Sequence, residues 1–67
     1  MKNNLRVQRA ILGVTQQQMA EKIGVSRQTI NAIESGKYVP STVLALKIGR
    51  QCGKQVEDIF FLEETDG

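Results

Sequence analysis

Residues 16–35 constrain the fold most, because they read as two short helices joined by a tight turn. Each half carries a pair of apolar residues three or four positions apart, which places each pair on one helical face: Met19 with Ile23, and Ile30 with Ile33. Gly24 lies between the pairs and can adopt the positive φ that ends a helix in a tight turn. The pattern predicts two packed helices that share an apolar contact.

The second of these helices carries polar side chains suited to reading nucleotide bases. Ser26 follows the turn and can cap the new helix. The outward positions offer guanidinium, amide and hydroxyl groups, which donate to and accept from base edges. These positions are Arg27, Gln28, Thr29 and Asn31.

Taken in register, the stretch resembles the helix-turn-helix of the lambda repressor and Cro-like family, often called Xre-like. The matching residues are Thr15-Gln16, Ala20, Gly24, Ser26-Arg27-Gln28-Thr29-Ile30 and Ile33-Glu34-Ser35-Gly36. The broader likeness covers residues 3–62. It implies an all-α, compact domain of four to five helices within residues 1–67, with the helix-turn-helix at 15–35 and a short extended tail at 59–67. It also implies a sequence-specific transcriptional regulator, a homodimeric repressor that reads a palindromic site in double-stranded DNA.

Individual DNA contacts follow from the residue types and from this resemblance. Arg suits the O6 and N7 atoms of guanine, and Gln and Asn suit the N6 and N7 atoms of adenine. We therefore expect base contacts from Arg27, Gln28 and Asn31, with Thr29 beside them. Contacts to the DNA backbone are expected from residues at helix ends and in the following loop: Gln16, Gln17, Ser26, Ser35, Lys37 and Tyr38.

Arg9 lies on an apolar face of the first predicted helix, where an unpaired charge would be costly. The resemblance pairs an Arg at this position with a Glu at the end of the recognition helix, which is Glu34 here. We expect the two residues to form a structural ion pair. Leu5 and Leu12 share the face of Arg9 and are expected to look inward.

A second apolar strip runs along the same helix, over residues 5–12. Val7, Ala10 and Ile11 form it, and a small all-helical domain is expected to wrap it into the core. Alternatively, the strip is a partner surface. The alternative function is therefore a protein-interaction module of the same fold, such as an antitoxin or an accessory factor.

Charge separates the body of the chain from its end. Residues 1–54 hold nine basic and two acidic side chains, a net of +7, whereas residues 55–67 hold five acidic and no basic ones. A basic body favours a polyanionic partner, although ordinary solubilising charge produces the same pattern.

Several classes of function have no support in the composition. The chain has no His, no nucleophile beside a base and no Gly-rich phosphate loop, so an enzyme is not expected. No metal-ligand cluster or cofactor motif is present. No apolar run approaches the roughly 20 residues of a membrane helix, and no signal peptide is recognisable. Cys52 alone cannot form an internal disulfide, which fits a cytoplasmic protein.

The end of the chain provides a candidate dimer interface. A chain of 67 residues buries only about 60% of its unfolded surface, so dimerisation is the expected source of extra stability. Four consecutive apolar residues cannot all point inward: Ile59, Phe60, Phe61 and Leu62. Either these side chains pack onto the core, or the segment is extended and pairs with its copy in a second chain across a two-fold axis. Further helices are expected at 42–51 and, as a short turn, at 56–59.

Overall fold

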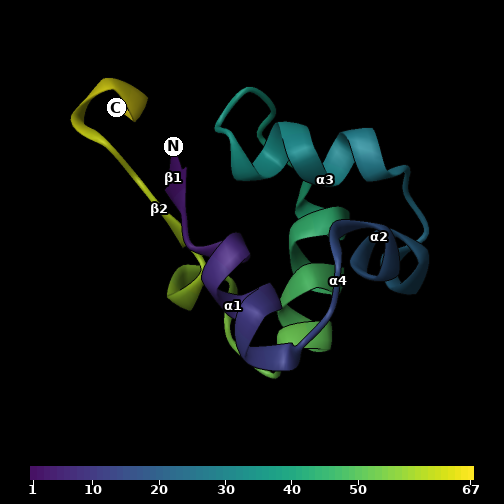
Figure 1. Ribbon diagram of the computed structural model, residues 1–67. Helices are drawn as coiled ribbons and strands as arrows, with labels where there is room; N and C mark the ends of the chain where they lie inside the picture. The colour runs from purple at the N-terminus through teal and green to yellow at the C-terminus, as the bar shows by residue number, and fades with distance from the viewer.

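The computed structural model describes residues 1–67 and is built from four α-helices (Figure 1). They are α1 (Leu5–Leu12), α2 (Gln16–Ile23), α3 (Arg27–Glu34) and α4 (Thr42–Cys52). Short elements complete the chain: strands β1 (Lys2–Asn3) and β2 (Phe60–Phe61), and 3-10 turns η1 (Val56–Asp58) and η2 (Glu64–Asp66). The predicted all-α fold is confirmed. β2 lies in the tail that was expected to be extended, whereas β1 was not predicted.

Local sequence signals set the ends of the helices. The Thr15 hydroxyl accepts a hydrogen bond from the Gln18 backbone N–H at 3.0 Å, and the Gln18 side chain accepts one from the Thr15 N–H at 2.8 Å. This capping box starts α2. Ser26 and Ser41 cap α3 and α4 by the side-chain bond alone, each hydroxyl accepting a backbone N–H at 3.2 Å. Gly24 ends α2 at φ +78°, a left-handed conformation that favours glycine.

The helices enclose one apolar core. Its fully buried side chains come from all four helices and the tail: Leu5, Met19, Ile30, Ile33, Ile48 and Ile59. The two apolar pairs of the helix-turn-helix segment are all buried, and Ala20 is fully buried beside them. The predicted apolar packing of α2 and α3 is therefore confirmed. No helix combines the length and apolar character needed to cross a membrane.

The buried face of α1 differs from the prediction. Leu5 is fully buried, but Leu12 is 42% exposed, so the expectation that Leu12 looks inward is wrong. The inward face instead passes through Gln8, whose exposed fraction is 8%. Leu12 lies in the last turn of α1, beside the exposed Gly13, and no neighbouring helix covers it fully.

The second apolar strip of α1 is also not buried. Val7 and Ile11 are 55% and 71% exposed, and Ala10 is exposed between them. The expectation that the core includes this strip is wrong, because α1 packs on α3 and α4 with one side only. The strip remains an open apolar surface.

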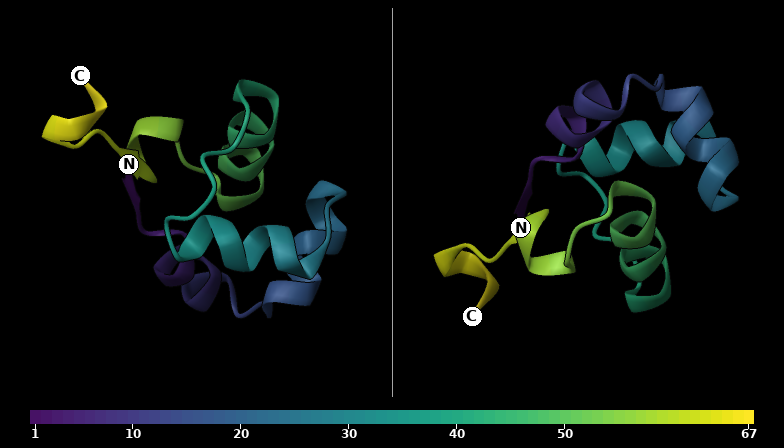
Figure 2. Two further views of the ribbon diagram at one scale, coloured as in Figure 1. Left: turned by 90° about the horizontal axis from the view of Figure 1, so that it is seen from above. Right: turned by 90° about the horizontal axis from the view of Figure 1, so that it is seen from below.

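The tail is fastened to the N-terminal segment of the same chain. β2 pairs antiparallel with β1, with Lys2 opposite Phe61 and Asn3 opposite Phe60. The two ends of the chain therefore lie side by side (Figures 1 and 2). Phe60 is buried with its neighbour Ile59, whereas Phe61 and Leu62 are 41% and 81% exposed. The alternative prediction was that this segment pairs with its copy across a two-fold axis. In the structure one edge of β2 pairs instead with β1 of the same chain.

Candidate nucleic-acid interface

α3 exposes a polar face opposite its buried one. Ile30 and Ile33 point into the core, while Arg27, Gln28 and Asn31 are exposed. Positions 27 and 31 are four residues apart, and 28 and 31 are three apart, so these side chains form one continuous patch. The patch offers one guanidinium and two amides to anything that lies along α3.

Thr29 and Ser26 are less available than their neighbours. The Thr29 side chain is half-buried, and its hydroxyl lies 3.0 Å from the Ser26 hydroxyl. Ser26 also accepts the Thr29 backbone N–H as the cap of α3. Both hydroxyls therefore take part in hydrogen bonds at the start of α3.

Gln16 joins α2 to α3. Its side-chain Nε2 donates to Glu34 Oε1 at 3.2 Å, and its Oε1 accepts from Arg27 Nη1 at 3.4 Å. Both polar ends of the side chain are thereby used inside the protein, and Arg27 is held at the start of α3. The sequence predicts a contact between Gln16 and the DNA backbone, which stays a prediction. The geometry adds a second role, in which Gln16 supports α3.

The first turn of α2 keeps its backbone donors free. The N–H groups of Gln16 and Gln17 donate to no group of the chain, whereas the next two are bonded to Thr15. Free N–H groups at a helix N-terminus attract anions, because the peptide dipoles align toward that end. The side chain of Gln17 is exposed beside them. This turn of α2 can therefore meet a phosphate through its main chain.

Glu34 is the centre of an ion-pair network beneath this surface. Its side chain is 1% exposed and accepts from Arg9 twice, from Nε at 2.7 Å and from Nη2 at 3.2 Å. Arg9 Nη1 also donates to the Val14 carbonyl at 3.1 Å. The Nε of the largely exposed Arg6 stands 3.6 Å from the same carboxylate. The ion pair expected between Arg9 and Glu34 is present, in the two-bond geometry that an Arg favours with a carboxylate.

Opposing effects set the ionisation of this pair. Burial acts to raise the pKa of the Glu34 carboxyl, but hydrogen bonds from Arg9 and Gln16 and the Arg9 charge outweigh it. The pKa of Glu34 therefore lies below its ordinary value. The hydrogen bond to Glu34 raises the pKa of Arg9. The carboxylate stays charged and ties α1, α2 and α3 together.

The loop after α3 is held to the helix by its backbone. The N–H groups of Lys37 and Tyr38 donate to the Ala32 carbonyl at 2.9 and 3.2 Å, and the Ser35 hydroxyl donates to the same carbonyl at 3.2 Å. The Lys37 and Tyr38 side chains are exposed, and neither makes a hydrogen bond or an ion pair within the chain. Both are therefore placed at the end of α3 with their side chains free.

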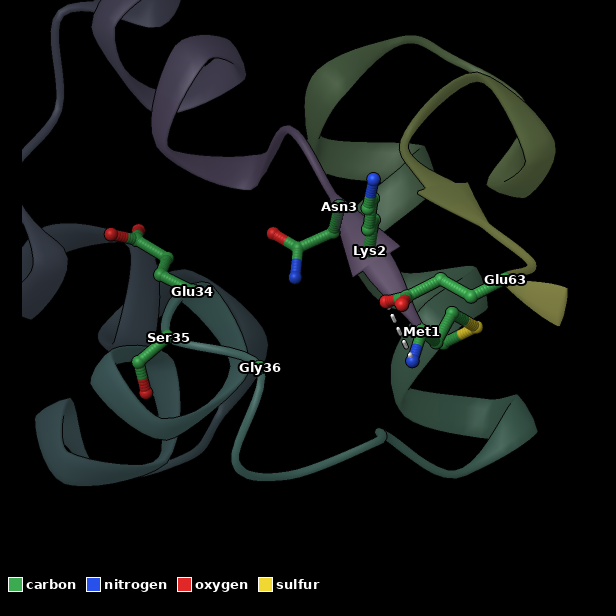
Figure 3. Close-up of a pocket in the computed structure, with 7 residues that line it drawn as sticks. All are labelled: Met1, Lys2, Asn3, Glu34, Ser35, Gly36 and Glu63. Atoms are coloured by element: carbon green, nitrogen blue, oxygen red, sulfur yellow. Dashed lines mark ion pairs between the residues drawn. The ribbon is translucent and has the colours of Figure 1, made fainter. Parts of the chain in front are cut away.

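A polar hollow of about 430 Å³ separates this loop from the start of the chain (Figure 3). Glu34, Ser35 and Gly36 stand on one side, and the Met1 ammonium meets Glu63 at 3.4 Å on the other. Asn3 reaches from β1 to α3, where its Nδ2 donates to the Ile33 carbonyl at 2.8 Å.

The Asn3 Oδ1 also accepts from the Leu5 N–H at 3.1 Å. The contact of Asn3 with α3 had no signal in the sequence, because 30 residues separate the partners. Asn4 precedes α1, makes no side-chain capping bond and donates to the Asp58 carbonyl. The N-terminal segment therefore anchors the end of α3. No group of three or more His, Cys, Asp or Glu residues is placed to hold a metal ion.

Known proteins resemble this chain over nearly its whole length. A helix-turn-helix family model matches residues 5–59. An uncharacterized HTH-type transcriptional regulator of Methanocaldococcus jannaschii is 53% identical over 66 residues, which cover 98% of this chain and 100% of that protein. Another, from Bacillus subtilis, is 50% identical with the same coverage. A third, from Methanothermobacter thermautotrophicus, is 49% identical over 96% of this chain and 94% of its own length.

Proposed function

This chain belongs to the helix-turn-helix family of DNA-binding transcriptional regulators, and on that premise we propose that it is a homodimeric repressor of a palindromic operator. In this proposal α3 lies in the major groove of double-stranded DNA. Arg27, Gln28 and Asn31 read base edges there.

One observation carries the proposal, namely the exposed polar patch on a helix whose opposite face is buried. Residues of α3 that point outward have hydrogen-bonding side chains, namely one guanidinium and two amides. The helix is also fixed in place by Gln16 and by the Glu34 network. Recognition groups that are held by the rest of the fold lose little freedom on binding.

Contacts to the DNA backbone would flank this patch. The free N–H groups of Gln16 and Gln17 suit a phosphate on one side, and the Lys37 and Tyr38 side chains suit one on the other. Ser35 contributes less, since its hydroxyl is bonded to Ala32. Such contacts position a protein on DNA without selecting its sequence.

The homodimer rests on symmetry and on exposed apolar residues of the tail. A two-fold dimer would set the two copies of α3 about 34 Å apart, one turn of B-DNA, and require a palindromic site. Of the four tail residues proposed for the interface, Ile59 and Phe60 are buried in their own chain, so Phe61 and Leu62 would make the contact. Repression is the simplest outcome, since a protein that occupies an operator blocks polymerase without a further contact.

The test is selection from a randomised duplex pool, followed by sequencing of the bound fraction at two salt concentrations. The expected result is a palindromic motif. Arg27→Ala and Gln28→Ala should each lose about 1–3 kcal/mol of discrimination at one base position. Lys37→Ala should weaken all sequences alike and reduce the slope of log K against log salt by about 1. Binding without sequence preference, in all variants, would rule out a regulator that reads an operator.

A second candidate function is a protein-interaction module, which the open strip on α1 favours. Val7 and Ile11 are 55% and 71% exposed, and Ala10 is exposed between them. Ile11→Asp should then leave DNA affinity unchanged and abolish a stable hetero-complex isolated from the native cell. The persistence of such a complex with Ile11→Asp would exclude this strip as its interface.

A further inference from the structure

α4 presents an exposed ridge on the side opposite its buried face. Val43, Leu46, Lys47 and Arg50 recur at the spacing of one helical side and line a hollow of about 270 Å³. Val43 and Leu46 are 64% and 58% exposed. Neither Lys47 nor Arg50 takes part in an ion pair of the chain. This α4 ridge is therefore an apolar floor bordered by two cations without partners.

The tail carries an exposed apolar side chain and an exposed acidic one, which match the apolar floor and the cations of the α4 ridge. Leu62, 81% exposed, is the most exposed large apolar side chain of the molecule. Glu63 is extended, with φ −106° and ψ 165°, and this separates Leu62 from Glu64 along the tail. Glu63 itself turns to the Met1 ammonium. Glu64 is exposed and has no cationic partner.

The spacings of the two surfaces agree. Two residues of extended chain span about 6.6 Å, which separates Leu62 from Glu64. The four residues from Leu46 to Arg50 rise by about 6 Å along the helix. A Leu62 side chain seated against Leu46, at the edge of the hollow, would therefore bring the Glu64 carboxylate beside Arg50.

The chain does not make this contact with itself. β2 is held to β1 by the pairing of Phe61 with Lys2, and the tail stands apart from α4 in both views of Figure 2. Another molecule must supply the tail, and a second copy carries both halves of the match. Two-fold symmetry then produces two equivalent contacts.

We infer that the tail of one copy docks on the α4 ridge of the second copy, with Leu62 at the edge of the hollow and Glu64 beside Lys47 and Arg50. This inference rests on the proposed homodimer and identifies its contact as side-chain docking rather than strand pairing. The complementary charges also set the direction in which the tail lies along α4.

The first experiment measures self-association of the full chain without DNA, by sedimentation equilibrium at low salt. Leu62→Ser and Leu46→Ser should each raise the dimer Kd at least about tenfold, because each substitution occurs twice in a symmetric dimer. Ile11→Ser, at the exposed strip of α1, is the matched control and should leave the Kd unchanged. Circular dichroism shows that each variant is folded. Wild-type Kd values for both leucine variants would overturn the docking.

A charge exchange tests the polar half of the contact. Glu64→Arg and Arg50→Glu should each weaken the dimer by about threefold or more, and more salt should reduce the effect. The two substitutions together in one chain restore the opposite charges and should recover the wild-type Kd. A double variant as weak as the sum of the two single variants would show that these side chains do not meet.

The outcomes separate this inference from the proposed function. A chain that stays monomeric at high micromolar concentration yet selects a DNA motif overturns the docking and leaves sequence reading intact. A dimer that responds to these substitutions but selects no DNA motif supports the docking and refutes the proposal that the chain reads an operator.

Discussion

Replacing Arg9 by Met should destabilise the fold by about 3 kcal/mol, because it leaves a buried carboxylate without its main partner. Glu34 is 1% exposed, and Arg9 supplies two of its hydrogen bonds. Breaking one side of a buried pair costs about 3–5 kcal/mol, and the low end applies because the Arg9 side chain is 18% exposed and Gln16 still donates to Glu34. Met retains the apolar stem of Arg9, so the loss reflects charge and hydrogen bonds.

The expected loss is large for a chain of 67 residues. An unfolding entropy of about 2.1 cal/mol/K per residue converts 3 kcal/mol into a fall in Tm of roughly 20 °C. The total stability of a domain this size is of order 3–10 kcal/mol. The assay is thermal and urea unfolding followed by circular dichroism, at a fixed protein concentration because association also stabilises.

Two further variants test whether the loss of stability comes from an unpaired buried carboxylate. Arg6 also lies near Glu34, at 3.6 Å, but its side chain is 73% exposed, so Arg6→Met should cost less than about 1 kcal/mol. Combining Arg9→Met with Glu34→Gln removes the uncompensated charge and should recover at least about 1 kcal/mol of the loss. If Arg9→Met lowers the free energy of unfolding no more than Arg6→Met does, the Arg9–Glu34 pair behaves as a surface pair and carries no buried-charge penalty.

Three other properties can be predicted from the structure. The folded pKa of Glu34 lies below its unfolded value of about 4.3. The contribution of the Glu34 carboxylate to the free energy of unfolding is therefore complete above that pH, and it is lost as the pH falls through the folded pKa. The urea midpoint of the wild type should therefore fall more steeply between roughly pH 5 and pH 3 than that of Glu34→Gln; parallel curves would contradict this. Gly49→Ala would place a Cβ 2.9 Å from the Lys54 carbonyl oxygen, so it should destabilise by about 1–3 kcal/mol, although alanine favours a helix; a raised Tm would show that the site relaxes freely. Burial raises the pKa of the Cys52 thiol, so alkylation at mildly alkaline pH should be much slower in the folded chain than in urea, and equal rates would show an open thiol.

The helix-turn-helix was predictable because its signals are local. The capping box at Thr15, the cap at Ser26 and the glycine at position 24 act through neighbours within four residues. The apolar spacing of α2 and α3 likewise depends only on helical geometry. The family resemblance then indicated the exposed side chains of α3, whose roles in DNA binding stay predictions.

Tertiary contacts decided which of the predicted site residues already make side-chain hydrogen bonds within the protein. A single sequence does not show that the Gln16 side chain is used by Glu34 and Arg27, since these partners are 18 and 11 residues away. Nor does it show that the Thr29 hydroxyl lies within hydrogen-bond distance of the Ser26 hydroxyl at the start of α3.

The sequence alone determined where the helices begin and end and which residue types α3 presents, because caps, turns and helical spacing act over a few residues. Only the tertiary structure decided that Leu12 and the Val7 strip stay exposed and that the tail pairs with Lys2 and Asn3. The reason is geometric: α1 has two apolar sides but is covered on one, and an apolar pattern shows that a face can be buried without showing what covers it. The pairing of β1 with β2 joins residues nearly 60 positions apart, a contact for which neither segment carries a local signal.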